Sequence, residues 1–131
     1  MNVLVVDDSR LARQELRRLL QRHPDVTVVG EAANADEAQL RIGELQPDLL
    51  LLDIHMPGRT GFELLADLEG ATPQVVFTTA FDQYAVQAFE VNALDYLLKP
   101  VDEQRLAAAL AKARVAQHAE TDPAEPTEVA H

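Results

Sequence analysis

The 131-residue sequence contains no cysteine, no long apolar run and few basic residues. The absence of cysteine excludes disulfide bonds and metal sites built from thiolates. No apolar run approaches the roughly 18 residues that a helix needs to cross a bilayer. The start MNVLVVDDS has neither the basic region nor the small-residue cleavage site of a secretion signal. We therefore expect a cytoplasmic protein with no membrane partner.

The charge of the chain is one-sided, because 22 acidic residues outnumber 11 basic ones and give a formal net charge of −11. Such a surface repels phosphate backbones, so we expect no nucleic-acid binding by this chain itself. Basic residues gather in RLARQELRRLLQR (10–22), whereas residues 115–131 contain no Lys or Arg. We predict one domain over residues 1–117 and a disordered acidic tail or interdomain linker over 118–131.

Short apolar runs alternate with segments whose apolar residues recur at helical spacing. Several of the runs are apolar at consecutive positions, which is typical of strands that are buried on both faces of a parallel sheet. Ser9, Asn34 and Asp102 are candidate N-caps, a third helix should end near Gly70, and 82–91 forms a short, weaker helix. The alternation predicts an α/β fold, doubly wound, with helices on both faces of a five-stranded parallel sheet. The predicted strands are 2–6, 26–32, 49–52, 74–79 and 93–99.

Polar residues end four of these strands or follow them directly. Each has an ordinary structural explanation by itself: a cap, a turn former, a strand residue or a surface loop. The carboxyl ends of parallel strands, however, meet at one edge of the sheet, where ligands bind in open α/β folds. The shared placement therefore favours a functional site at this edge. Its candidate members are Asp7, Asp8, Asp53, Thr79 and Lys99, with Pro100 next to the lysine.

The residue types at this edge indicate metal and phosphate chemistry. Three close carboxylates repel one another unless a cation lies between them, and Mg²⁺ (or Mn²⁺) suits an all-oxygen site. His55 alone does not support a zinc site. A carboxylate beside such a cation can act as the nucleophile on a phosphoryl group, while a lysine neutralises charge. The stretch PDLLLLDIHMPG fits this role, since the leucines anchor Asp53 and MPG turns the chain away from its carboxylate.

Four motifs, in their order and spacing, resemble the receiver domain of two-component response regulators. They are VVDD, LLLLDIHMPGRTG, VVFTTA and ALDYLLKP, and the resemblance covers residues 2 to about 117. The run FDQYAVQAFEVNALDYLLKPVD further resembles receivers of LytTR/AlgR-type transcription regulators, in which a DNA-binding domain follows. The resemblance implies the strand order 2-1-3-4-5 and a phosphorylated switch rather than a turnover enzyme.

The resemblance assigns a role to each residue of the acidic group. Asp53 would accept a phosphoryl group from a sensor histidine kinase or from a small phosphodonor. Asp8 would ligate Mg²⁺ directly and Asp7 through water, with Asp53 and the backbone carbonyl of His55 completing the protein ligands. The side chain of His55 therefore need not be a ligand.

The resemblance also assigns the switch. Lys99 would pair with the phosphoryl oxygens and form a cis peptide bond with Pro100. Thr79 would turn its hydroxyl onto the phosphate, and Tyr96 would swing inward behind it. These movements would alter the surface formed within residues 82–116, through which the protein would dimerise.

Two residues lie two positions beyond the key residues of their strands: His55 after Asp53, and Phe81 after Thr79. Both should flank the phosphoryl group, and Phe81 would obstruct the attacking water and tune the lifetime of the phosphorylated state.

Several alternatives stay open at this point. The chain is either a stand-alone receiver that docks onto a partner or the N-terminal part of a DNA-binding regulator. An aspartyl-phosphate phosphohydrolase would need an acid at position 55, where His55 stands. A flavin-binding module fits less well, because DDSRLAR (7–13) offers carboxylates where backbone donors should bind phosphate. A degenerate receiver that is never phosphorylated is a further alternative.

Overall fold

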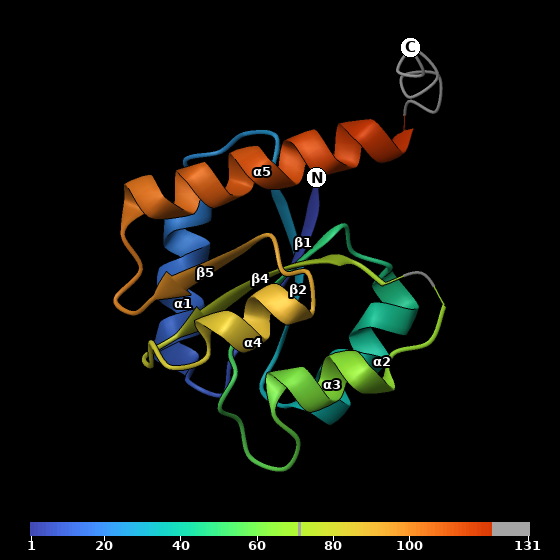
Figure 1. The fold of residues 1–131 in the computed structure, drawn as a ribbon. Helices are drawn as coiled ribbons and strands as arrows, with labels where there is room; N and C mark the ends of the chain where they lie inside the picture. Colours follow the sequence, from blue (N-terminus) through green and yellow to red (C-terminus); the bar gives the residue numbers. More distant parts are fainter. Residues whose placement is uncertain (71, 122–131) are drawn as a thin grey trace.

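A five-stranded parallel sheet lies at the centre of the structure, in the order β2-β1-β3-β4-β5 (Figure 1). The computed structural model describes residues 1–70 and 72–121. All neighbouring strands pair in parallel. The predicted fold class and strand order are therefore confirmed. The strands are β1 (Asn2–Val6), β2 (Thr27–Ala32), β3 (Leu49–Leu52), β4 (Gln74–Thr79) and β5 (Asp95–Leu98).

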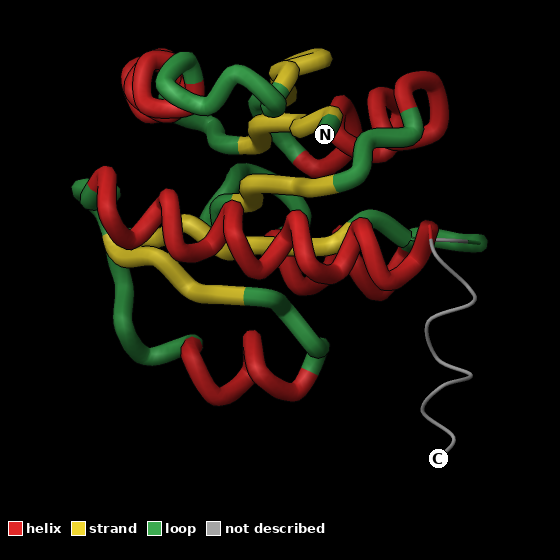
Figure 2. Tube along the Cα trace, turned by 90° about the horizontal axis from the view of Figure 1, so that it is seen from above, coloured by secondary structure: helices red, strands yellow, loops and turns green. Residues whose placement is uncertain are grey.

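Helices cover both faces of the sheet, as Figures 1 and 2 show. Buried side chains of α1 and α5 pack on one face, and those of α2, α3 and α4 pack on the other. This is the doubly wound arrangement that right-handed crossovers produce. The helices are α1 (Arg10–Leu20), α2 (Ala35–Leu45), α3 (Gly61–Asp67), α4 (Ala85–Glu90) and α5 (Glu103–Thr121).

The consecutive leucines of β3 are explained by this double coverage. Leu49 and Leu51 belong to the core beneath α1 and α5, whereas Leu50 and Leu52 belong to the core beneath α2, α3 and α4. All four are fully buried, and burial of each contributes about 1.5–3 kcal/mol. The strand that carries Asp53 is therefore held from both sides.

Three helices begin at the predicted caps. The side chains of Ser9 and Asn34 accept backbone N–H groups of the first turns of α1 and α2. Asp102 accepts the N–H groups of Gln104 and Arg105 at the start of α5.

One helix end differs from the prediction. α3 ends at Asp67, three residues before the predicted stop at Gly70, because Leu68 adopts an extended conformation. α5 runs through Thr121. Most of the predicted tail, residues 122–131, lies outside the described residues. None of the helices in the described ranges has the length and apolar character that crossing a bilayer requires.

Gly61 allows α3 to begin against the backbone of the β3–α3 loop. A Cβ atom there would lie 2.6 Å from the carbonyl oxygen of Asp53, whereas a Cβ on Gly43, within α2, would meet nothing within 4 Å. We expect Gly61→Ala to lower the free energy of unfolding by about 1–3 kcal/mol through overpacking. The matched Gly43→Ala should raise it by about 0.5–1 kcal/mol through helix propensity. Urea unfolding measures both, and equal stability of the two variants would contradict this explanation.

Candidate functional site

The structure brings the three predicted carboxylates together at the carboxyl edge of the sheet. Val6 and Leu52 are paired in register, so Asp7 and Asp53 leave neighbouring strands at the same level. Each of Asp7, Asp8 and Asp53 offers a carboxylate oxygen, and these oxygens lie within 4.8 Å of one another. Asp7 is fully buried and Asp53 is 5% exposed, whereas Asp8 faces solvent.

Lys99 reaches the same group from β5. Its Nζ atom lies 2.7 Å from Asp7 Oδ2 and 3.5 Å from Asp53 Oδ2. Its backbone N–H donates to the carbonyl of Thr79, which fixes the end of β5 beside β4. The Lys99–Pro100 peptide bond is cis. One ammonium therefore lies against two buried carboxylates.

Asp7 is held in place by local hydrogen bonds. Its Oδ1 atom accepts the backbone N–H of Ser9, and its carbonyl accepts the Arg13 guanidinium at 2.7 Å. Arg13 in turn forms an ion pair with Glu31 on β2. The other carboxylate oxygen of Asp7, Oδ2, is buried, and its described polar partner is the Lys99 ammonium at 2.7 Å.

This environment raises the pKa of Asp53 to about 6 from its ordinary value of 3.8. Burial of the carboxyl group is the main cause, the negative charge of Asp7 adds to it, and Lys99 opposes both. Burial works against the charged form of Lys99, but the hydrogen bond to Asp7 and the charges of both carboxylates outweigh it and raise the lysine pKa. The site therefore stabilises positive charge.

The donor set fits a hard divalent cation. Three clustered carboxylates and one ammonium leave an excess of negative charge, and the Asp7 Oδ2 atom has an unused acceptor position. Oxygen-only coordination of this kind suits Mg²⁺ or Mn²⁺. The ring of His55 does not belong to the cluster; it is exposed and its Nε2 atom lies 2.9 Å from the hydroxyl of Tyr84.

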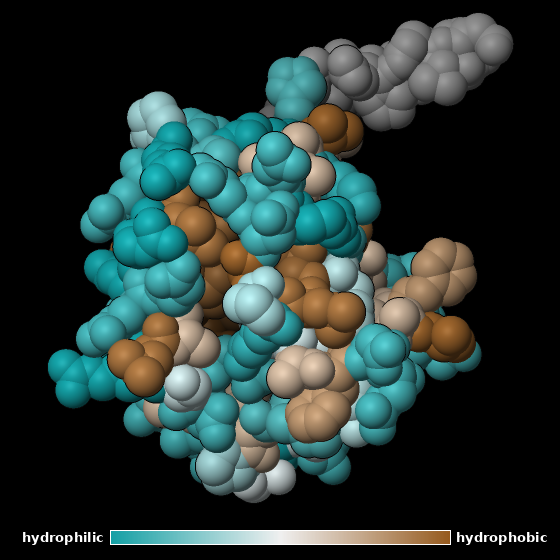
Figure 3. Space-filling model, turned by 90° about the vertical axis from the view of Figure 1, so that its left-hand side faces the viewer, coloured by the Kyte–Doolittle hydropathy of each residue, from teal (hydrophilic) through white to brown (hydrophobic). Residues whose placement is uncertain are grey.

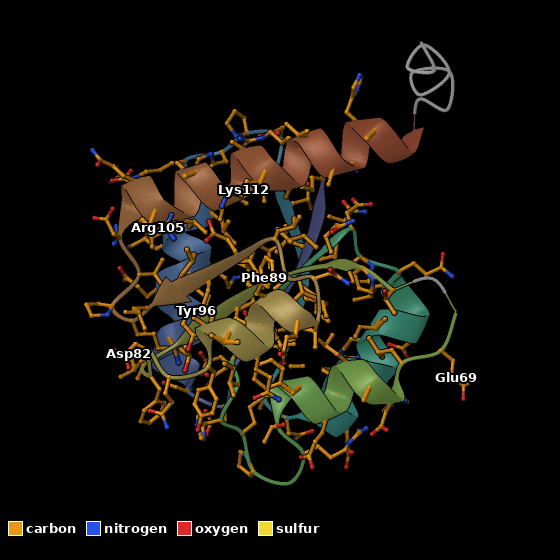
Figure 4. All side chains as sticks on the ribbon, viewed as in Figure 1. Glu69, Asp82, Phe89, Tyr96, Arg105 and Lys112 are labelled. Carbon is orange, nitrogen blue, oxygen red and sulfur yellow. The ribbon has the colours of Figure 1, made fainter. Side chains whose placement is uncertain are left out.

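The two predicted switch residues bind the loop between β4 and α4. Thr79 is buried, and its hydroxyl accepts the backbone N–H of Phe81 at 3.3 Å. The hydroxyl of Tyr96 donates to the carbonyl of Phe81 and accepts the backbone N–H of Tyr84 at 3.3 Å. Figure 4 places Tyr96 beside this loop and α4. In this structure both hydroxyls thus bind the loop backbone.

Two features of the site region were missed by the sequence analysis. Tyr84 contacts His55 across 29 residues, and no sequence spacing signals a hydrogen bond of that kind. Asp95 forms ion pairs with Arg105 at 3.1 Å and Lys112 at 3.2 Å, which ties β5 to α5. Figure 4 labels Arg105 and Lys112 along α5. The signal for this pair of contacts was the spacing of Arg105 and Lys112 by two helical turns.

Comparison with known proteins now decides the family. The profile described as the response regulator receiver domain matches residues 3–111. The chain belongs to the response regulator receiver family. Receiver domains are switches and not turnover enzymes, so the predictions of family and of non-enzymatic character are confirmed.

Longer proteins are similar to this receiver over part of their length. The chain is 50% identical over 123 residues to an uncharacterized response regulatory protein of Vibrio cholerae, covering 93% of this chain and 52% of that protein. It is 50% identical over 115 residues to the transcriptional regulatory protein BtsR of Escherichia coli, covering 87% and 48%. The chain thus spans about half the length of the curated relatives it matches.

Solved receiver structures are also similar. The response regulatory domain of protein mrkE from Klebsiella pneumoniae is 35% identical with a TM-score of 0.81, covering 88% of this chain and 97% of that one. The REC domain of AraT from Geobacillus stearothermophilus is 30% identical with a TM-score of 0.82, covering 92% and 97%.

The raised pKa of Asp53 predicts a pH-dependent stability in the absence of metal. The folded state binds the Asp53 proton more tightly than the unfolded chain does, so this contribution to stability is present below pH 3.8 and is lost as the pH rises through about 6. We expect Asp53→Asn to be more stable than the wild type above this range, by up to about 3 kcal/mol. Urea unfolding in chelator at several pH values measures the difference. A constant difference between acidic and neutral pH would contradict the prediction.

Proposed function

We propose that this receiver accepts a phosphoryl group on Asp53 from a sensor histidine kinase or a small phosphodonor. The observation that carries the proposal is the clustering of Asp7, Asp8 and Asp53 against the ammonium of Lys99. An Asp53 oxygen attacks phosphorus, the bond from phosphorus to the donor breaks, and the donor leaves with the bonding electrons. The Nζ atom of Lys99 lies 3.5 Å from Asp53 Oδ2 and would pair with the transferred phosphoryl oxygens.

Asp8, Asp7, Asp53 and the backbone carbonyl of His55 would hold Mg²⁺, with Asp8 as a direct ligand and Asp7 acting through water. When bound, this cation supplies positive charge for the carboxylates and the incoming phosphoryl oxygens. The unused acceptor position of Asp7 Oδ2 and the excess negative charge support this assignment. Mn²⁺ would serve in the same way.

Phosphorylation would switch the loop between β4 and α4. For Thr79 to turn its hydroxyl onto the phosphate, it must give up the N–H of Phe81. For Tyr96 to move inward, its hydroxyl must leave the Phe81 carbonyl and the Tyr84 N–H. The phosphoryl group favours this exchange because it stabilises the side-chain positions that contact it. The loop and the start of α4 are therefore the elements that respond.

The responding surface would carry the signal outward. It comprises α4, β5 and α5. Apolar side chains are exposed on α4, on the residue that caps its C-terminal end and on β5: Val86, Phe89, Val91 and Leu98 are 41–81% exposed. Figure 3 shows brown, apolar side chains at the right-hand edge and in the middle of one face. Homodimerisation through this surface would bring two DNA-binding domains together, since DNA half-sites commonly recruit two-fold dimers.

Control of transcription is the proposed output. The resemblance to LytTR/AlgR-type receivers supports it, and so do relatives named transcriptional regulatory protein that are about twice as long as this chain. Residues 1–117 would form the receiver and 118–131 the linker to a DNA-binding domain, with cytoplasmic location. A stand-alone receiver that acts by docking onto a partner protein is the alternative.

Incubation with Mg²⁺ and a small phosphodonor should add one phosphoryl group to the wild type, because the donor needs only the receiver's own site. Intact-mass measurement detects it, and Asp53→Asn should gain none. Beryllium fluoride, which mimics the acylphosphate, should shift the sedimentation of the wild type toward a dimer and leave Asp53→Asn unchanged. Modification of the Asn variant to the same extent would contradict Asp53 as the acceptor; a monomer that binds beryllium fluoride would contradict dimerisation.

Phe81 should slow hydrolysis of the phosphorylated protein, because its ring follows Thr79 by two residues and lies 4.7 Å from the ring of His55. We expect Phe81→Ala to lose phosphate several-fold faster, as expected when a group that excludes water is removed. Leu40→Ala, which truncates an exposed side chain on α2, is the control and should keep the wild-type rate. An unchanged rate for Phe81→Ala would disprove this role.

A further inference from the structure

Three aromatic rings connect the loop that follows Asp53 with the loop that follows Thr79. The ring centroids of His55 and Phe81 are 4.7 Å apart, which joins the two loops directly. Tyr84 packs on both partners, at 5.2 Å from His55 and at 6.4 Å, edge-on, from Phe81. Leu52 of β3 pairs with Phe77 of β4, and the loops that follow Asp53 and Thr79 leave the same edge of the sheet. The rings therefore lie on the loops that follow Asp53 and Thr79 at this edge of the sheet.

Tyr84 is the member of this group with the most connections. Its hydroxyl lies 2.9 Å from Nε2 of His55, within hydrogen-bonding distance. Its backbone N–H donates to the hydroxyl of Tyr96. Tyr84 is also the N-cap residue of α4, a helix without a side-chain capping bond. One residue thus contacts the loop after the phosphate acceptor, the predicted switch tyrosine and the start of the responding helix.

We propose that Tyr84 is a positioning residue that holds His55 against Phe81 and so keeps the rings closed beside the Asp53 pocket. The inference rests on the proposed phosphorylation of Asp53. Tyr84 does not touch the reacting atoms in this arrangement; it acts through the ring of His55. The closed rings restrict the approach of water and small phosphodonors alike.

The hydrogen bond matters because His55 is otherwise weakly held. Its side chain is exposed, and its described contacts are the two rings and the Tyr84 hydroxyl. Tyr84 is better anchored: it packs against the core beneath α2, α3 and α4, and its ring lies 6.3 Å from that of Phe62. Tyr84, which is better anchored, therefore holds the ring of His55 in place. This arrangement also links the exposure of the pocket to the position of α4.

Tyr84→Phe keeps the ring and removes the hydroxyl, which lies 2.9 Å from His55 Nε2 and also accepts a longer hydrogen bond of 3.4 Å from Gln83. We expect the rate of phosphorylation by a small donor and the rate of hydrolysis of the phosphoprotein both to increase by about two- to ten-fold. This is the change in rate that loss of one hydrogen bond of modest strength produces. His55→Phe should give a similar increase, and the double variant should be no faster than the faster single variant. The Mg²⁺ affinity of Tyr84→Phe, measured by calorimetry, should stay at the wild-type value, because Tyr84 supplies no proposed ligand atom.

Three outcomes overturn the inference. They are wild-type rates in Tyr84→Phe, independent and multiplicative effects of the two substitutions, or acceleration of hydrolysis without acceleration of donor attack. The double-mutant comparison separates positioning from general loosening, since loosening of α4 by Tyr84→Phe would not depend on His55. The wild-type protein in the same assay tests the proposed function: if it takes up no phosphoryl group at Asp53, both proposals fail, whereas uptake with unchanged variant rates defeats the role of Tyr84 alone.

Discussion

The ion pairs of Lys99 with Asp7 and Asp53 are the interaction on which the site depends. Two buried carboxylates side by side are unfavourable, and removing charged groups from water costs several kcal/mol for each ion unless they are compensated. The Lys99 ammonium offsets part of this unfavourable free energy. Burial and the charge of Asp7 still outweigh it, so the pKa of Asp53 stays raised. The fold supplies the rigidity for this arrangement, because the leucines of β3 are buried on both faces. A cation and a phosphoryl group would meet a charge pattern that is already in place.

The same residues explain how a local event can reach a distant surface. The two hydroxyls that would serve the phosphorylated state are occupied here by the backbone of the β4–α4 loop. Phosphorylation would set up a competition for these hydroxyls between the phosphate side and the loop. α4 is short, buries Ala88 alone of its residues and lacks a side-chain cap, so its position depends on those contacts. Asp95 holds β5 to α5 through Arg105 and Lys112, which makes that half of the surface the firmer one.

Much of this was predictable from the sequence because the signals are local. Consecutive apolar residues marked strands buried on both faces, and Ser9 and Asn34 marked helix starts through their own side-chain bonds. Polar residues placed directly after strands marked the site edge. The end of α3 was not predictable from Gly70, because the chain turns into an extended conformation at Leu68. The contacts of Tyr84 depend on how two loops meet in space, which no spacing in the sequence encodes.

The ionisation of Asp53 in the metal-free protein tests the central claim most directly. A carboxyl-carbon NMR titration, with the resonance assigned through Asp53→Asn, should show this group titrating near pH 6. Replacing Lys99 with methionine should move its pKa further upward, because the opposing positive charge is lost. Titration near the ordinary value of 3.8, with no response to Lys99→Met, would show that the buried carboxylates do not interact as described.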